Sequence, residues 1–320
     1  MTKACYIIVS VFLLPLIIIH FYSCNTAKQY HRPDIVTDSV YYNVKHGDSS
    51  NIALIKWENI FSDTLLKKLI RGGIENNLDL KIAIQRIDEA ESFLKQRGAE
   101  RFPDLKVETQ TGITRQSDNS VKGLTDNKPV ANYRVGLSSS WEIDLWGKLR
   151  SARRSAYAEL LKTEAIKRSV QTKLIADIAT EYYNLLLYRS QEKIIELTIR
   201  NREEDLETVK LMKNAAMLTE AAVKQSEAQV YAAKILLPKL RTQINISSNA
   251  INIFLGKMPS RIESGDLDDS PQLTIDTLPG YPAQLLVNRP DVFSSEQSLR
   301  ASFENTNVAR ANFYPSLSIT

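Results

Sequence analysis

The sequence predicts a mainly α-helical protein that carries one β-hairpin of amphipathic strands and one long helical hairpin. Three observations lead to this fold class: a 90-residue stretch, 148–237, without Gly or Pro; two runs in which apolar and polar residues alternate strictly; and an internal repeat with a constant offset of 212 positions. Gly and Pro interrupt regular structure, and 11 of each among 320 residues is little over half the usual share. We therefore expect few and long elements.

The composition excludes several classes of functional site. The formal charge of +4 comes from 41 basic and 37 acidic residues interspersed along the chain, unlike the concentrated basic surface of a nucleic-acid-binding protein. Both cysteines and all three histidines lie before position 47. Because zinc sites and Ser-His-Asp or Cys-His catalysis need these side chains, we expect no metal, no cofactor, no reaction and no nucleic-acid partner. Carboxylate-only chemistry stays open, although no spacing points to it.

The N-terminus resembles a bacterial export signal. Lys3 precedes an apolar run over 4–19 that is short for a membrane-spanning helix, and a Ser-Cys pair ends at Cys24. This pair resembles a lipobox, at which a peptidase cuts before a cysteine that then carries acyl chains. We predict a signal peptide at 1–23, a covalent lipid on Cys24 and a lipid-anchored extended segment at 24–56. The alternative is an ordinary signal peptide with an incidental cysteine.

Two segments align without gaps at the offset of 212. Identical residues recur at Asn76 and Asn288, Asp79 and Asp291, Gln85 and Gln297, Ala99 and Ala311, Pro103 and Pro315, and Leu105 and Leu317. Each copy predicts a helix of about 23 residues that stops at an aromatic–proline step, because the residue before proline leaves the α region. We assign short helices to 57–103, a linker to 257–287 and the start of a second repeat to 288–320.

A repeat unit of this length indicates a duplicated half-molecule rather than a solenoid. The second copy stops inside its first expected strand. By the same offset we expect a whole protein of about 470 residues, of which this chain is a C-terminally truncated part.

Strict period-2 patterning predicts two β-strands, at 105–114 and 133–145, and we assign 104–146 to their hairpin. One face is apolar with spaced aromatic residues and the other is polar, as in a transmembrane barrel with lipid outside and water inside. The residues expected to face lipid are Val107, Ile113, Tyr133, Val135, Leu137 and Trp141. Those expected to face the lumen are Lys106, Glu108, Gln110, Arg134, Glu142 and Asp144.

A hairpin of this kind has two interpretations. On a soluble protein the apolar face would lie on a core, and the polar face would be a solvated outer surface. Across a membrane, the four strands expected of a complete chain fall short of the eight or so that close a small barrel. Symmetric association solves this problem, since three protomers would supply twelve strands around one channel.

The stretch without Gly and Pro predicts very long helices. Its apolar residues recur at three- and four-residue steps and form one stripe, which includes Leu174, Ile178, Tyr182 and Leu185. A helix over 148–213 would be roughly 100 Å long at 1.5 Å per residue. The pattern then breaks before Thr219, a candidate N-cap for a second helix that Pro238 is expected to bend and that ends near Gly256. We assign 147–256 to this helical hairpin.

Four motifs occur in a fixed order along the chain. The most recognisable spans 141–150, with Trp146-Gly147 at the strand-to-helix junction, and the others lie at 57–70, 278–292 and 308–318. Together they resemble TolC-like outer-membrane efflux factors, specifically the lipoprotein (NodT-type) branch that works with resistance-nodulation-division pumps. The resemblance covers nearly the whole predicted mature chain.

The resemblance implies a homotrimer with a β-barrel in the lipid of the outer membrane and an α-helical tunnel in the periplasm. It implies passive export of drugs or other small molecules, which an inner-membrane efflux pump delivers through a periplasmic adaptor protein. In such proteins the tip of the helical hairpin contacts the adaptor, and the matching residues are Ala216, Met217, Leu218, Thr219 and Glu220. The family usually has Gly in place of Ala216, and a plain helix connection is the alternative for this turn.

Other functions compete with this interpretation. A periplasmic adaptor (membrane-fusion) protein also has an export signal and a long helical hairpin, but its Gly-rich flanking segments are missing from this sequence. An envelope hydrolase that uses carboxylates conflicts with the lack of His and Cys in the body of the chain. A non-conducting structural envelope lipoprotein remains an alternative, and the sequence does not identify the exported substrate.

Overall fold

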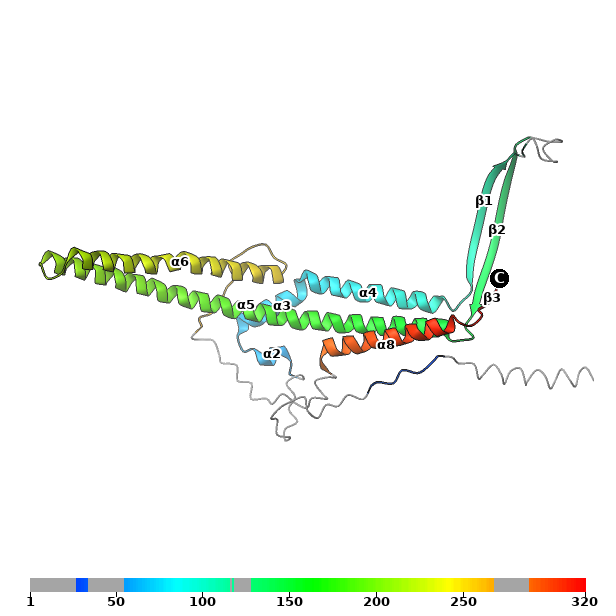
Figure 1. The fold of residues 1–320 in the computed structure, drawn as a ribbon, viewed down its shortest axis with the longest axis horizontal. Coiled ribbons are helices and arrows are strands. Elements are labelled where there is room, and N and C mark those ends of the chain that lie inside the picture. The colour runs from blue at the N-terminus through cyan, green and yellow to red at the C-terminus, as the bar shows by residue number, and fades with distance from the viewer. Residues whose placement is uncertain (1–26, 34–54, 116, 118–127, 268–287) are drawn as a thin grey trace, which may run out of the picture. The chain divides into compact units, whose positions relative to one another are not determined.

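The structure is a computed structural model that describes residues 27–33, 55–115, 117, 128–267 and 288–320. The predicted signal peptide and Cys24 lie outside these residues. The chain forms two compact units: the first comprises Met1–Ile35, Ile87–Lys162 and Ser294–Thr320, and the second comprises Val36–Arg86 and Thr163–Phe293. In chain order (Figure 1) the elements are α2 (Trp57–Ile60), α3 (Thr64–Asn76), α4 (Leu78–Ala99), β1 (Asp104–Thr114), β2 (Val130–Ile143), α5 (Lys148–Asn214), α6 (Glu220–Phe254), α8 (Pro290–Ala311) and β3 (Leu317–Ile319).

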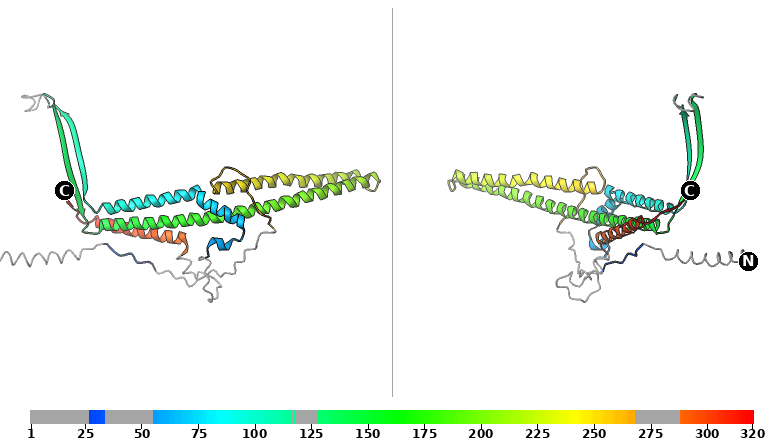
Figure 2. Two further views of the ribbon diagram at one scale, coloured as in Figure 1. Left: turned by 180° about the vertical axis from the view of Figure 1, so that it is seen from behind. Right: turned by 45° about the vertical axis from the view of Figure 1, so that its right-hand side comes forward.

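Helix α5 is one unbroken helix of 67 residues, which confirms the helix predicted over 148–213. At 1.5 Å per residue it is about 100 Å long. Within the second unit, α6 runs back alongside α5 in every view (Figure 1 and Figure 2). Ion pairs join the two helices, between Arg241 and Glu192 at 2.8 Å, Arg241 and Glu196 at 3.1 Å, and Lys234 and Glu203 at 2.6 Å. The predicted helical hairpin is therefore present.

Helix α6 ends where the sequence predicts, because Gly256 terminates it. Gly256 has a φ of 62°, in the left-handed region that glycine adopts without strain. The N–H of the next residue, Lys257, donates to the carbonyl of Asn252 at 2.9 Å, which closes a Schellman motif. A Cβ at this glycine would lie 2.8 Å from the backbone oxygen of Asn76, so a larger residue does not fit. Pro238 lies inside α6 without dividing it.

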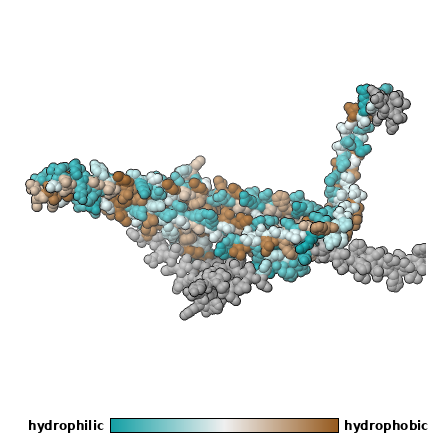
Figure 3. Space-filling view, in the orientation of Figure 1, coloured by the Kyte–Doolittle hydropathy of each residue, from teal (hydrophilic) through white to brown (hydrophobic). Residues whose placement is uncertain are grey.

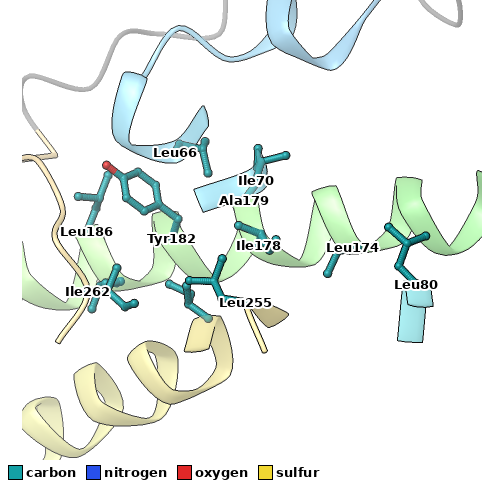
Figure 4. Close-up of a cluster of buried hydrophobic side chains, with 12 residues drawn as sticks. Leu66, Ile70, Leu80, Leu174, Ile178, Ala179, Tyr182, Leu186, Leu255 and Ile262 are labelled. Carbon is teal, nitrogen blue, oxygen red and sulfur yellow. The ribbon is translucent and has the colours of Figure 1, made fainter. Parts of the chain in front are cut away.

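The core of the second unit lies where α3, α5 and α6 meet (Figure 4). The stripe predicted on α5 is confirmed, since Leu174, Ile178, Tyr182 and Leu185 are each 5% exposed or less. Leu66 and Ile70, one turn apart on α3, share this cluster with Ile251 and Leu255 from α6 and its C-cap. The three- and four-residue spacing places these side chains on one side of each helix, and their removal from water stabilises the unit.

The beginning of the predicted linker at 257–287 is part of the same core. Ile262 is 5% exposed and belongs to the buried cluster. Its carbonyl accepts a hydrogen bond from Arg189 Nη2 of α5 at 2.8 Å, and Lys193 of α5 pairs with Asp266. The segment is therefore packed against α5 at its start, while its later part, 268–287, lies outside the described residues.

Helices α4 and α8 carry the repeat. Each has 22 residues, and their bounds differ by 212 positions, as the aligned sequences predict. Each stops before the predicted aromatic–proline step, and a strand follows: β1 after α4 and β3 after α8. The two helices differ in what they bury. Helix α4 buries Leu80 and Ala83, whereas α8 buries Gln297, Ala301, Glu304, Asn307 and Ala311.

A polar network joins α8 to the first turns of α5 in the first unit. Glu304 is 3% exposed and accepts two hydrogen bonds from the guanidinium of Arg154, at 2.8 and 2.9 Å. Arg154 also donates to Ser151 at 2.9 Å, and Ser155 Oγ donates to the carbonyl of Ala301 at 3.2 Å. A buried carboxylate is costly without a cationic partner, so this pairing sets the register of α8 on α5.

The three strands form one antiparallel sheet in the order β1-β2-β3. Strand β1 pairs with β2 along its whole length, from Asp104 opposite Ser140 to Thr114 opposite Val130. Strand β3 pairs only with the last residues of β2. The predicted hairpin is confirmed, and the strand of the second repeat adds to its base.

Candidate functional site: the strand hairpin and the helical tip

The register of the hairpin separates two faces. Val107 lies opposite Leu137, and Thr109 lies opposite Val135, whereas Gln110 of the alternate set lies opposite Arg134. Because successive side chains of a strand point to opposite faces, each set stays together along the hairpin. The structure thus brings together on one face Val107, Ile113, Tyr133, Val135, Leu137 and Trp141. The other face carries Lys106, Glu108, Gln110, Arg134 and Glu142.

The apolar face of the hairpin is open. Val107, Ile113, Tyr133, Val135 and Leu137 are between 69% and 80% exposed, and Trp141 is 37% exposed. A soluble amphipathic hairpin buries its apolar face on a core, because a two-stranded ribbon is only marginally stable in water. No element in the described ranges covers this face. The open face therefore favours a hairpin that contacts an apolar environment outside the chain. It argues against a soluble hairpin that lies on the protein's own core.

The base of the hairpin holds the strands to the neighbouring backbone. The indole Nε1 of Trp141 donates to the carbonyl of Arg101 at 3.1 Å. Lys148 Nζ, at the start of α5, lies 2.8 Å from Glu142 Oε1. Glu142 therefore lies on the polar face at the end of β2 and is paired with a lysine.

The expectation that Asp144 faces a lumen from a strand is wrong in its placement. Strand β2 ends at Ile143, and the carboxylate of Asp144 accepts hydrogen bonds from the N–H groups of Leu149 at 3.1 Å and Arg150 at 3.0 Å. These N–H groups belong to the first turn of α5, which has no intrahelical partner for them. The carboxylate satisfies these N–H groups and lies at the positive end of the helix dipole. For this reason Asp144 belongs to the cap of the helix and not to the strand. The side chain of Asp144 thus caps the first turn of α5.

Trp146 joins the strand-to-helix junction to the second repeat, a contact that sequence reasoning missed. Its ring stacks on that of Tyr314 with 4.7 Å between centroids, and its Nε1 donates to the carbonyl of Pro315 at 2.8 Å. Gly147 follows at a φ of 75°, which allows the chain to turn into α5. Both motifs were visible in the sequence, but no spacing indicated that the Trp of one meets the Tyr-Pro step of the other.

The tip of the helical hairpin is a Schellman turn with an unusual residue. After the last residue of α5, Ala216 adopts a φ of 58°, and its N–H donates to the carbonyl of Lys213 at 2.9 Å. The N–H of Met217 donates to the carbonyl of Met212, also at 2.9 Å. This position normally takes glycine, because a Cβ is strained in the left-handed region. Thr219 occupies the predicted N-cap position of α6, without a side-chain capping bond.

Large apolar side chains are exposed at the tip. Met217 is 73% exposed and Leu218 38%, and they continue into Leu211 and Met212 of α5, which are 68% and 42% exposed. The last two residues were not predicted as part of the tip, although their apolar side chains in a polar helical segment are a signal. In Figure 3, hydrophobic residues lie among hydrophilic ones along the visible part of the α5–α6 hairpin.

The one predicted acidic residue at the tip is neutralised by lysines. Glu220 lies 2.7 Å from Lys213 and 3.9 Å from Lys224. The hydrogen bond and charge of Lys213 hold the pKa of Glu220 below its ordinary value. The tip therefore offers a partner exposed apolar side chains, and its carboxylate is already paired with lysines.

Two kinds of feature are missing from the described part of the chain. Among its helices, none has a stretch both long and apolar enough to cross a membrane. In the same residues, no group of three or more His, Cys, Asp or Glu side chains is placed to hold a metal ion. Cys24 lies outside the described residues, so the lipid anchor stays a prediction.

Known proteins share this sequence pattern. The family model described as "Outer membrane efflux protein" matches residues 69–257. The toluene efflux pump outer membrane protein TtgI of Pseudomonas putida is 34% identical over 284 residues, which cover 86% of this chain and 58% of TtgI. The cation efflux system protein CusC of Escherichia coli (strain K12) is 26% identical over 300 residues, which cover 93% of this chain and 64% of CusC. The chain therefore spans less than two thirds of the length of these relatives.

Solved structures share the fold. The outer-membrane channel OprN matches with a TM-score of 0.76 and 27% identity, over 92% of this chain and 66% of OprN. CusC matches with a TM-score of 0.75 and 26% identity, over 91% of this chain and 65% of CusC. The mainly α-helical fold with a strand hairpin and the resemblance to TolC-like efflux factors are thereby confirmed, and the outer membrane is the location of this group of proteins. Since the family model spans more than half of its residues, this chain belongs to the outer membrane efflux protein family.

Proposed function

We propose that this chain is a protomer of an outer-membrane channel through which small molecules leave the periplasm passively, without a chemical reaction at the chain itself. The observation that carries the proposal is the two-faced hairpin of β1 and β2, with one open apolar face and one polar and charged face. In a membrane, such a hairpin turns its apolar side to lipid and its polar side to water. Membership of the family supports the same role.

In this proposal the polar face of the hairpin lines the channel. The lining residues are Lys106, Glu108, Gln110, Arg134 and Glu142. Asp144 is not among them, because it caps α5. Mixed positive and negative side chains along the wall would keep the lumen hydrated and make the passage of polar solutes easy.

The working assembly is a homotrimer. Within the described residues β1 is an edge strand, since its second edge has no partner, and unpaired strand edges inside a membrane are not tolerated. The α5–α6 hairpin also exposes large apolar side chains, among them Leu197, Tyr231 and Ile235 at 54%, 64% and 71%. Association of identical protomers would pair the edges and cover these side chains. With the four strands expected of a complete chain, three protomers would reach the strand number that a channel needs.

The partners are a periplasmic adaptor protein and an inner-membrane efflux pump. The tip residues 216–220, together with Leu211 and Met212, form the surface that the adaptor would contact, and their exposed apolar area supports this assignment. The acyl chains on Cys24 would hold the chain in the lipid of the outer membrane. TtgI and CusC are named for toluene and cations, so we propose apolar organic molecules or cations as the exported class.

The decisive experiment is the conductance of the purified full chain in planar bilayers. We expect stepwise channel openings from trimers, and a change of ion selectivity toward cations when Arg134 is replaced by Glu, because the substitution reverses a charge on the channel wall. The matched control is Val135→Ile on the neighbouring, lipid-facing position, which should leave selectivity unchanged. Trimers that reach the membrane but never conduct would refute the channel and favour a structural lipoprotein.

A further inference from the structure

Residues 27–33, here called the strap, lie along α8 in the first unit. The contact centres on Asn307, which is 1% exposed. Its Oδ1 accepts a hydrogen bond from the N–H of Lys28 at 3.2 Å, and its Nδ2 donates to the carbonyl of Lys28 at 2.9 Å. One amide side chain therefore pairs with both main-chain groups of one residue, as a neighbouring β-strand would do.

The orientation of the Asn307 amide is fixed from the helix side. Its Nδ2 also donates to Glu304 Oε2 at 3.2 Å, and its Oδ1 also accepts from Arg310 Nη1 at 3.2 Å. Both donor hydrogens and both acceptor sites of the amide are thus used. Glu304 is in turn held by Arg154, so the buried network of the first unit positions the side chain that holds the strap.

Two further contacts extend the docking along the helix. The ring of Tyr30 meets that of Phe303 edge to face at 5.6 Å between centroids, and the guanidinium of Arg300 lies 6.0 Å from the Tyr30 ring. Arg32 forms an ion pair with Glu296 at 3.0 Å. The strap is thus bound by main-chain hydrogen bonds, an aromatic contact and a charge pair.

These contacts fix the direction of the strap. As the strap runs from Lys28 to Arg32, its partners run back from Asn307 to Glu296, so the strap is antiparallel to α8. Four extended residues span about 13 Å and eleven helical residues about 16 Å, which fits a strap stretched along the helix. The N-terminal end of the strap therefore points to the end of α8 from which the chain enters β3.

The repeat shows that only α8 is built for this contact. Subtracting the offset of 212 from the four docking residues of α8 gives the equivalent residues of α4. Glu296, Arg300, Phe303 and Asn307 correspond to Ile84, Asp88, Glu91 and Lys95. Ile84 has no charge to pair with Arg32, and Glu91 has no ring to contact Tyr30. Lys95 can donate hydrogen bonds but cannot accept one from the N–H of Lys28. The two repeats have the same helix bounds but only the second carries the docking residues.

We propose that α8 is a dedicated docking site for the strap, which holds the N-terminal membrane anchor at the strand end of α8. The anchoring role rests on the proposed acylation of Cys24. Four peptide steps separate Cys24 from Lys28, a reach of at most about 14 Å, and Asn307 lies about 6 Å along the helix axis from the end of α8. The docked strap would thus place the lipid anchor and the base of the β1–β2 hairpin at the same membrane surface.

Hydrogen exchange of the full chain, acylated and embedded in phospholipid vesicles, tests the docking. We expect strap amides to exchange at least about fivefold faster in Asn307→Lys, which introduces the residue of the first repeat and removes the acceptor of the Lys28 N–H. Because Asn307 is buried, Arg32→Glu at the surface provides a second variant, and adding Glu296→Arg should restore protection. The matched control, Lys95→Asn on α4, should leave the strap unchanged.

Several outcomes would overturn the proposal. Strap amides that exchange at the unprotected rate in the unaltered chain would show that α8 does not hold the strap. Loss of protection on acylation, measured against Cys24→Ser, would show that the anchor and the docking are incompatible. Absence of acyl chains from Cys24 by mass spectrometry would remove the anchoring role. None of these readouts depends on conductance, so failure of the channel proposal is distinguishable from failure of the docking.

Discussion

The hydroxyl of Tyr182 lies 2.7 Å from Oδ2 of Asp63, although 119 positions separate the two residues. Oδ1 of the same carboxylate caps α3 through the N–H groups of Leu65 at 2.7 Å and Leu66 at 3.2 Å. One carboxylate therefore starts α3 and fixes it to the middle of α5. Tyr182 is fully buried in the core, so its hydroxyl has no water to replace this partner.

Replacing Tyr182 by Phe should lower the free energy of unfolding by about 1.5 kcal/mol, because a hydrogen bond to a charged acceptor is lost while the ring stays packed. Thermal unfolding followed by circular dichroism measures this change. Tyr157→Phe is the matched control, since that ring is 48% exposed, and its effect should stay within about 0.5 kcal/mol. Equal effects of the two substitutions would contradict a structural role for the Tyr182 hydroxyl.

The same pair predicts a dependence of stability on alkaline pH. Burial, and then the hydrogen bond to Asp63, raises the pKa of Tyr182 above its ordinary value. The folded state therefore binds the phenolic proton more tightly than the unfolded state. This contribution is fully present below about pH 10 and is lost as the pH rises above that value. Urea midpoints measured from pH 8 to 11 should fall more steeply for the unaltered chain than for Tyr182→Phe, and parallel curves would disprove the linkage.

Ala216→Gly should stabilise the tip of the helical hairpin by about 1 kcal/mol, because Ala216 has a φ of 58° and glycine removes the strain of a Cβ in that region. Amide exchange of the last turn of α5 measures the local effect. Ala215→Gly, one residue earlier and without a positive φ, is the control and should be neutral or destabilising. A tip that exchanges faster in Ala216→Gly would contradict the strain argument.

Arg154→Met should destabilise the first unit by about 3 kcal/mol, because it leaves the buried carboxylate of Glu304 without its cation. Adding Glu304→Leu to this variant should recover much of the loss, since the unpaired charge is then removed. Thermal unfolding of the single and double variants measures both changes.

An exposed pair on the same helix provides the control for Arg154. Lys162 lies 3.0 Å from Glu159, and neither side chain is buried, since the two are 30% and 48% exposed. Lys162→Met should cost less than about 0.5 kcal/mol. If the variant with both Arg154→Met and Glu304→Leu were less stable than Arg154→Met alone, an unpaired buried carboxylate could not be the cause of the lost stability.

Val135→Arg should reduce insertion of the hairpin into the outer membrane, because a charge on a lipid-facing barrel position costs about 2–4 kcal/mol near the bilayer midplane. Val135 is 78% exposed and lies on the apolar face. Gln110→Arg on the opposite face is the control and should insert normally. Heat-modifiable mobility of outer-membrane fractions on gels measures insertion, and equal losses in both variants would show that the two faces meet the same environment.

Sequence reasoning located most of the elements because their signals are local. The lack of Gly and Pro and the apolar spacing determine α5, and period 2 determines β1 and β2. The failure at Asp144 has a specific cause: its alternation continues the strand pattern, but its carboxylate is the strongest nearby acceptor for the first N–H groups of α5. The tip was located at the right residues, yet its left-handed alanine was invisible, since alanine is the best helix former.

The sequence by itself therefore determined the lengths and order of the elements, the two faces of the hairpin and the equivalence of the two repeats, all of which follow from spacing along one chain. Only the tertiary structure showed that Trp146 meets Tyr314, that Tyr182 holds Asp63 and that Asn307 holds Lys28. These contacts join residues more than a hundred positions apart. Their partners are selected by packing between elements, and no spacing along the chain shows which side chain meets which.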